Sequence, residues 1–418
     1  MAENIDWEFI ASLEGKGVTT GYVPDPTGSK SGVTIATGFD LGQRNETDLT
    51  TLGLSAGLIT KLKPYLGLKG TVADEFLKKT PLTITDDEAK EIDNKVRAQK
   101  VPKLKQQYAQ SAHNTAKIAF DDLPSQAQTV IASVSFQYGT LSVKTPKFWT
   151  AASSQDWVES VKILRNFGDS YRTRRGKEAD LLEQVVKFNE LILQVMRWNL
   201  IWFSLIFMFS SVACGTSLGK TQTIIFDEKL SSAYKNYETS AAEKRKEIVF
   251  ESGAKAGNCQ EYWREKEKST VKEDVANMLY RSEYLMCDAL QILKKAEAKN
   301  EFANQTDVSA NYAKEIYSRL DLTSFPSSMS QQMTGKEVSF EQQKDKFSAK
   351  IENNSIVSDT KDWHFAVNIA AAADVNKNGK QDLIVWVIDE AKEGNYRSYS
   401  TLLIYDVENK GNLKATIP

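Results

Sequence analysis

Histidine and cysteine are scarce in this sequence. The only two histidines, His113 and His364, lie far apart along the chain. A histidine-based zinc site or a Ser–His–Asp triad is therefore not expected, although a single histidine acting as a base stays open. All three cysteines, Cys214, Cys259 and Cys287, lie in the second half. This asymmetry indicates two halves that fold in different redox environments.

The chain also lacks a large charge of either sign. Its 53 basic and 55 acidic residues give a formal net charge of -2, which provides no case for a nucleic-acid partner or a cationic membrane-surface protein. The first residues, MAENIDWEFIASLEGKG, lack the basic-then-apolar order of a secretory signal, so none is expected there. At 418 residues the chain is long enough for two or three domains.

The patterns of apolar and turn-forming residues divide the chain into segments. Residues 4–14 have helical spacing, and Val18–Gly42 contains two β-rich runs around a Pro/Asp/Gly/Ser turn. Helical patterns then dominate until the period changes to two at Trp363, which predicts the α+β class. We expect a first domain over 1–190, an apolar segment over 191–214, a mainly helical region over 215–360 and a β-rich region over 361–418.

Two carboxylates near the N-terminus are suited to glycosidase chemistry. Cleavage of a glycosidic bond needs an acid and a carboxylate that activates water or attacks the sugar. Glu14 ends the first helix, where partial burial would keep it protonated, and Asp40 lies between glycines in TGFDLG. The hydroxyl of Thr34 can hold a water. Taken singly, Glu14 also fits a solvated helix end and Asp40 a turn or cap residue.

The combined pattern LEGKG…GYVPDPTGSKSGVTIATGFDLG resembles the catalytic region of the pesticin-like muramidases, relatives of the phage lysozymes. The resemblance covers residues 3–185 and implies a lysozyme-like domain. It implies that Glu14 is the general acid, that Thr34 positions the water and that Asp40 is the general base. The order of Thr before Asp is the pesticin order, and Ala36 stands where the family usually has glycine.

Two later stretches resemble the same family. SVSFQYG is similar to its cleft-lining helix, and FWTAASSQDWVESVKILRNFGDSYRTRRGKEADLL is similar to its closing segment. The Arg-rich and Glu positions of that segment are occupied by Arg172, Arg174, Arg175 and Glu178.

The resemblance implies hydrolysis of the β-1,4 bond between N-acetylmuramic acid and N-acetylglucosamine in peptidoglycan. No cofactor is implied for catalysis. An inverting course is expected, because a water held by a threonine needs space between the carboxylates. The sequence alone leaves the retaining course open.

An apolar stretch in mid-chain, MRWNLIWFSLIFMFSSVACG, has the order of a secretory signal: a basic start, an apolar run and small residues before a cysteine. SVAC resembles the lipobox of bacterial lipoproteins, which implies lipidation of Cys214, although Ser211 replaces the usual aliphatic residue. A membrane anchor and a buried core helix are the alternatives. Either of the first two interpretations brings this segment into contact with a membrane.

Lipidation of Cys214 would leave Cys259 and Cys287 as an even pair in an oxidising periplasm. A disulfide between them is then expected. Two buried thiols are the alternative.

The loop DVNKNGKQDL has oxygen-bearing residues at alternating positions around a glycine, which suits Ca²⁺. The position of the usual bidentate Glu holds Val385, in the following strand. A plain Asn-Gly hairpin turn explains the loop equally well. The four candidate ligands are Asp374, Asn376, Asn378 and Asp382.

The simplest interpretation is two proteins in one chain. Residues 196–418 resemble a complete lipoprotein precursor, and the arrangement resembles an effector–immunity pair, as in type VI secretion or bacteriocin systems. The enzyme half would be made in the cytoplasm and delivered to the periplasm of target cells, where it acts on glycan strands. The second half would be a periplasmic lipoprotein that binds and inhibits the first. The alternatives are a phage-like endolysin with an accessory lipoprotein and a membrane-anchored glycan-binding protein without catalysis.

Overall fold

The computed structural model describes residues 4–14, 17–24, 26, 31–196, 223–297, 306–333, 338–392 and 394–418. Cys214 and most of the apolar segment predicted over 191–214 lie outside these residues, so the structure does not test their role. Within the described residues, no helix is long and apolar enough to cross a membrane.

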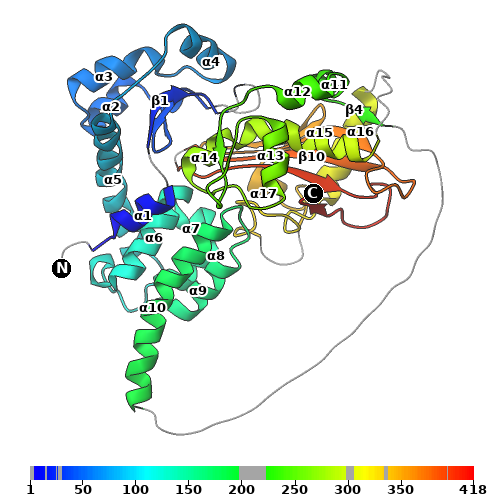
Figure 1. Ribbon diagram of the computed structural model, residues 1–418. Coiled ribbons are helices and arrows are strands. Elements are labelled where there is room, and N and C mark those ends of the chain that lie inside the picture. The colour runs from blue at the N-terminus through cyan, green and yellow to red at the C-terminus, as the bar shows by residue number, and fades with distance from the viewer. Residues whose placement is uncertain are drawn as a thin grey trace.

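The N-terminal part is mainly helical, with one small sheet (Figure 1). The sheet has three antiparallel strands in the order β1-β2-β3. The elements are α1 (Trp7–Glu14), β1 (Val18–Tyr22), β2 (Thr34–Ala36), β3 (Phe39–Asp40), α2 (Glu46–Leu52), α3 (Ala56–Leu62), α4 (Gly70–Lys79), α5 (Asp86–Ala109), α6 (Ser125–Tyr138), α7 (Leu141–Lys144), α8 (Pro146–Ser153), α9 (Trp157–Arg165) and α10 (Arg172–Met196).

Helix α5 joins two hydrophobic cores in this part of the chain. Thr85 and Glu88 form a capping box at its start, which satisfies backbone donors that a helix N-terminus leaves free. Ile92 packs into the core beneath the small sheet, whereas Leu104 packs into the core around α6. The helix therefore fixes the sheet relative to the helical lobe, and the cleft described below lies between them.

The C-terminal part is built around one antiparallel sheet in the order β12-β11-β10-β9-β8-β7, with β4 paired to β9. Long apolar strands with buried residues at nearly every position make β9, β10 and β11 its centre. The elements are β4 (Ile224–Ile225), α11 (Glu228–Lys235), α12 (Tyr237–Ala242), β5 (Ile248–Val249), β6 (Lys255–Ala256), α13 (Cys259–Lys266), α14 (Val275–Tyr280), α15 (Leu285–Lys295), α16 (Thr306–Arg319), α17 (Lys344–Phe347), β7 (Lys350–Glu352), β8 (Ser355–Asp359), β9 (Trp363–Ala373), β10 (Asp382–Ala391), β11 (Arg397–Ile404) and β12 (Ala415–Thr416).

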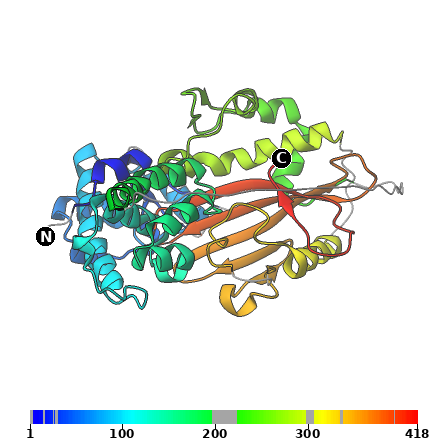
Figure 2. The same cartoon turned by 90° about the horizontal axis from the view of Figure 1, so that it is seen from below.

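Helices cover both faces of this sheet (Figure 2). Leu290 of α15 and Leu230 of α11 pack with Ile384 in one core cluster. Ile316 of α16 packs with Val367 in another cluster. Because both faces of the sheet are covered, the central strands are continuous apolar runs and do not alternate between apolar and polar residues. The α+β prediction is confirmed for both parts of the chain.

Some elements lie outside the regions expected from sequence. Strands β4, β7 and β8 precede residue 361 and belong to the same sheet as the later strands. Strands β4 and β7 have only two and three residues, too few for the sequence pattern to reveal them. The sheet therefore gathers strands from both expected regions of the second half.

A disulfide joins Cys259 at the start of α13 to Cys287 in α15, with the Cα atoms 5.1 Å apart. Both residues are buried in a cluster that includes Tyr262 and Tyr284. The pair expected from cysteine counting is therefore a bond between two helices of the C-terminal part.

The two parts of the chain share one hydrophobic core. Tyr138 and Tyr171 of the N-terminal part pack against Tyr396, with ring centroids 4.9 and 5.1 Å apart. Trp363 stacks on Tyr138 at 5.6 Å. These packed rings make the contact between the two parts an aromatic interface.

Candidate active site

Asp40 ends β3 and caps the short 3-10 helix Leu41–Gln43. Its Oδ1 accepts hydrogen bonds from the backbone N–H groups of Gly32 at 3.0 Å and Gly42 at 2.8 Å, while Oδ2 is buried and has no hydrogen-bond partner among the described residues. Burial raises the pKa of Asp40, and the charge of Arg397 and the two backbone hydrogen bonds oppose that rise. One carboxylate oxygen of Asp40 is therefore fixed by the backbone, while the other makes no hydrogen bond to the described residues.

The two glycines beside Asp40 allow the backbones to approach closely. A Cβ on Gly32 would lie 2.3 Å from the carbonyl oxygen of Leu68 and 2.4 Å from the Cα of Gly42. Such distances are below any real Cβ contact, so a side chain here would move the backbone that holds Asp40.

Gly32→Ala is expected to destabilise the protein by about 3 kcal/mol, because backbone atoms cannot move aside as a flexible side chain can. Gly57→Ala is the matched control, since a Cβ there meets nothing within 4 Å. Urea unfolding of the two variants measures the difference. Equal midpoints would show that the Gly32–Gly42 contact does not constrain the fold.

Glu14 is the last residue of α1 and is only 5% exposed. Helix α1 is fixed on α6 by Trp7, whose ring meets that of Phe136 edge-on at 5.5 Å. Glu14 Oε1 accepts a hydrogen bond from Nδ2 of Asn395 at 2.6 Å and lies 3.7 Å from Nη2 of Arg174. The alternative interpretation of Glu14 as a solvated helix end is therefore excluded.

Thr34 lies on β2 with its side chain fully buried. Its Oγ1 donates to the carbonyl oxygen of Gly32 at 3.2 Å, and the residue does not line the pocket that contains Glu14 and Asp40. The water-positioning role of Thr34 stays a prediction. Ala36 has a φ of 51°, a left-handed conformation that glycine adopts most readily, which explains a preference for glycine at this position.

Thr37 lines the pocket instead, and it is held by Asp93 of α5. The Thr37 hydroxyl donates to Asp93 Oδ2 at 2.7 Å, and its backbone N–H donates to Oδ1 at 3.2 Å. Burial and, to a smaller extent, the charge of Glu14 raise the pKa of Asp93, while the bonds from Thr37 lower it. Asp93 was not predicted from the sequence as a site residue. The one signal for it is that it lies one helical turn before Arg97, so that both side chains are on the same face of α5.

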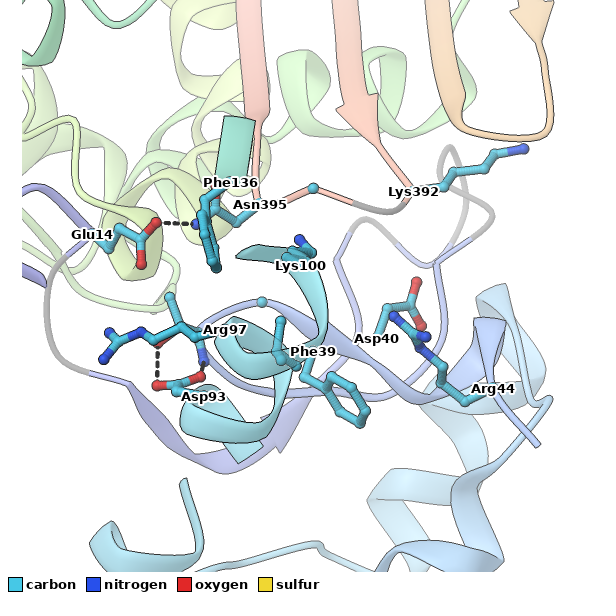
Figure 3. Close-up of a pocket in the computed structure, with 14 residues that line it drawn as sticks. Glu14, Phe39, Asp40, Arg44, Asp93, Arg97, Lys100, Phe136, Lys392 and Asn395 are labelled. Atoms are coloured by element: carbon cyan, nitrogen blue, oxygen red, sulfur yellow. Dashed lines mark hydrogen bonds between the residues drawn. The ribbon is translucent and has the colours of Figure 1, made fainter. Parts of the chain in front are cut away.

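The pocket lies between the small sheet, α1, α5 and the turn that joins β10 to β11 (Figure 3). Glu14 and Asp40 lie on opposite sides of it, the arrangement that a pair of glycosidase carboxylates requires. Lys392, Gly394 and Asn395 of the C-terminal part also line it, and the space left is about 40 Å³. That volume holds a few waters and no sugar ring.

A buried charge network lies next to Glu14. Glu178 accepts hydrogen bonds from Ser133 Oγ at 2.5 Å and Arg174 Nε at 3.2 Å, and it also pairs with Arg175. Arg175 Nε binds Asp169 Oδ2 at 3.0 Å. These residues hold α10 against α6 and bring one guanidinium close to Glu14. Arg172, which the sequence grouped with them, lines a separate pocket.

The candidate calcium loop connects β9 to β10 as a hairpin. Within it, the carboxylates of Asp374 and Asp382 accept hydrogen bonds from backbone N–H groups. Asp374 accepts from the N–H groups of Asn378 at 2.9 Å and Gly379 at 2.8 Å. Asp382 accepts from Val375 at 2.9 Å and Asn376 at 3.3 Å. Among the described residues no group of three or more acidic, histidine or cysteine side chains could hold a metal ion. The structure therefore lends no support to the Ca²⁺ interpretation.

The comparisons with known proteins agree with this geometry. Residues 4–158 match the Pesticin family model, described as a bacterial toxin homologue of phage lysozyme, C-term. The N-terminal part is pesticin-like. The match contains Glu14, Thr34 and Asp40 and ends before the Arg174–Glu178 network. A search of curated proteins found no match to the chain.

The pesticin-like match supports a glycoside hydrolase of the muramidase type that acts on peptidoglycan. Lysozyme-like enzymes need no cofactor for catalysis. The match does not extend to the C-terminal part, whose role has to be inferred from its contacts.

Proposed function

We propose that the pesticin-like part hydrolyses the β-1,4 bond between N-acetylmuramic acid and N-acetylglucosamine. Glu14 protonates the leaving oxygen, and Asp40 activates a water on the opposite side of the sugar. The position of these two carboxylates on opposite sides of one pocket supports this assignment. Thr34 was expected to position the water, and the pocket-lining Thr37 is a second candidate for that task.

We propose further that the C-terminal part inhibits this enzyme. The observation that carries this proposal is the hydrogen bond from Asn395 to Glu14, which joins residues from the two parts inside the pocket. A substrate cannot reach Glu14 while this contact persists, since the remaining space is too small for a sugar. The pair would then be an antibacterial toxin and its immunity protein.

The location of each part belongs to the same proposal and rests on the sequence. The toxin part would reach the periplasm of target cells by a secretion route such as type VI secretion. The second part would be a periplasmic lipoprotein anchored through Cys214. The disulfide between Cys259 and Cys287 supports an oxidising compartment for this part.

The structure bears differently on the two alternative functions. An endolysin with an accessory lipoprotein gives no reason for a residue of the second part to contact the general acid, as Asn395 does. A glycan-binding protein without catalysis gives no reason for two carboxylates facing one pocket. Both observations favour the toxin and its inhibitor.

Product analysis tests the hydrolase. Residues 1–196 are incubated with purified peptidoglycan, the products are reduced with borohydride and the reduced sugar is identified by mass spectrometry. A muramidase leaves N-acetylmuramic acid at the new reducing end, so the reduced product is N-acetylmuramitol. Reduced N-acetylglucosamine, or glycan binding without any product, would contradict the assignment.

A further inference from the structure

We infer that the turn between β10 and β11 inhibits the enzyme as a mimic of an N-acetylated sugar, with its amide groups in the positions that the substrate's acetamido groups would take. This inference rests on the proposed muramidase activity and names the part of the chain that regulates it. Gly394, Asn395 and Tyr396 belong to this turn, which joins β10 to β11. Gly394 and Asn395 also line the pocket.

Three amide groups of the turn bind acceptors of the pesticin-like part. The carboxamide of Asn395 donates to Glu14 Oε1 at 2.6 Å. The backbone N–H of Asn395 donates to the carbonyl oxygen of Phe136, and that of Tyr396 to the carbonyl oxygen of Gln137, each at 3.3 Å. An acetamido group has the same chemistry, namely one amide N–H donor and one carbonyl acceptor.

The acceptors belong to the pesticin-like part itself and stand at the end of a helix. The last carbonyls of a helix have no partner within the helix and are satisfied from outside. In α6 the carbonyls of Phe136 and Gln137 accept hydrogen bonds from the turn, and the Phe136 side chain lines the same pocket as Glu14 (Figure 3). When the turn leaves, the carbonyls of Phe136 and Gln137 become free acceptors for the N–H groups of a bound glycan.

Gly394 permits this approach. A Cβ on this residue would lie 1.8 Å from the carbonyl oxygen of Gln137 and 2.7 Å from its carbonyl carbon. The turn therefore reaches the end of α6 only because residue 394 has no side chain. Any substitution at this position pushes the turn away from the acceptors that it binds.

The turn is held in this place from both sides. The hydroxyl of Tyr171 donates to the carbonyl oxygen of Arg397 at 2.6 Å, and the N–H of Arg397 lies 3.1 Å from the same hydroxyl oxygen. The Tyr396 ring packs between Tyr138 and Tyr171, and its hydroxyl lies 3.3 Å from Asp389 Oδ2. The buried Arg397, the first residue of β11, also places a positive charge close enough to oppose the pKa rise of Asp40.

The test uses the full chain and three variants: Asn395→Asp, Gly394→Ala and the control Gly257→Ala. Asn395→Asp brings a second carboxylate against Glu14, and Gly394→Ala places a methyl group on a backbone carbonyl. A Cβ on Gly257, in the same half of the chain, meets its nearest neighbour at an ordinary 3.7 Å. Calorimetry measures binding of the N-acetylglucosamine hexamer and of the fully de-N-acetylated hexamer. Near-ultraviolet circular dichroism checks that each variant is folded. Hydrolysis of purified peptidoglycan by each variant is measured in parallel.

We expect the unaltered chain and Gly257→Ala to bind neither hexamer measurably. Asn395→Asp and Gly394→Ala should bind the acetylated hexamer at least 10-fold more tightly than the de-N-acetylated one, and should hydrolyse peptidoglycan at least 10-fold faster than the unaltered chain. Tight binding of the acetylated hexamer by the unaltered chain would overturn the inference, as would folded variants that bind no hexamer. Equal binding of the two hexamers would overturn the mimicry of the acetamido group. Variants that bind the acetylated hexamer and release no product would instead refute the proposed hydrolase and leave the inhibitory turn in place.

Discussion

Glu14→Gln is expected to slow peptidoglycan hydrolysis by residues 1–196 by about 10³-fold, within the range that loss of a general acid costs. Glutamine has nearly the same shape as glutamate but cannot give a proton to the leaving oxygen. Glu14 is buried at the end of α1 and its carboxylate lines the pocket. The substitution therefore removes the proton donor while the helix and the pocket keep their form.

Glu8→Gln provides the matched control for this variant. Glu8 lies on the same helix and is exposed, so the same chemical change there should leave the rate unaltered. The rates are measured as loss of turbidity of a purified cell-wall suspension, with thermal melting as the check on folding. Hydrolysis by Glu14→Gln at the rate of the Glu8→Gln variant would remove Glu14 from the mechanism.

The full chain is expected to hydrolyse peptidoglycan about 10³-fold more slowly than residues 1–196. Two parts of one chain face each other at an effective concentration of about 1 mM, so a dissociation constant of about 1 μM would leave about one molecule in a thousand open. The aromatic contacts around Tyr138 and Trp363 and the bond from Asn395 to Glu14 support an affinity at least that high.

Adding residues 223–418 to residues 1–196 in stoichiometric excess should restore the inhibition. The same part with Asn395→Asp is the control, because it keeps the aromatic interface and places a carboxylate against Glu14. The control should inhibit at least 10-fold less well. Undiminished hydrolysis with the unaltered second part in excess would show that the contacts between the two parts do not regulate the enzyme.

The local sequence predicted those features of the site that depend on neighbours along the chain. Glu14 stands at a helix end because the apolar spacing of α1 stops there, and a glycine follows Asp40 at residue 42 because the backbone there approaches that of Gly32. The disulfide between Cys259 and Cys287 was expected because these two residues remain of the three cysteines if Cys214 is lipidated. Each of these features is set by residue type and short-range spacing.

The loop containing Asp374 shows where a local pattern is insufficient. Alternating oxygen ligands around a glycine suit a cation, but the same carboxylates also accept backbone N–H groups, as Asp374 does from Gly379. Which of the two occurs depends on how the turn closes between its strands. The pairing of Thr37 with Asp93 likewise depends on where α5 lies against the small sheet.

The α+β class follows from the periodicity of the sequence, and the choice of Glu14 and Asp40 as candidate carboxylates follows from the resemblance of their motif to the pesticin-like muramidases. The hydrogen bond of Asn395 to Glu14, 381 positions earlier in the chain, is seen in the folded protein alone. A contact of this range leaves no periodic pattern. It arises because the aromatic core shared by the two parts places the turn between β10 and β11 at the end of α6.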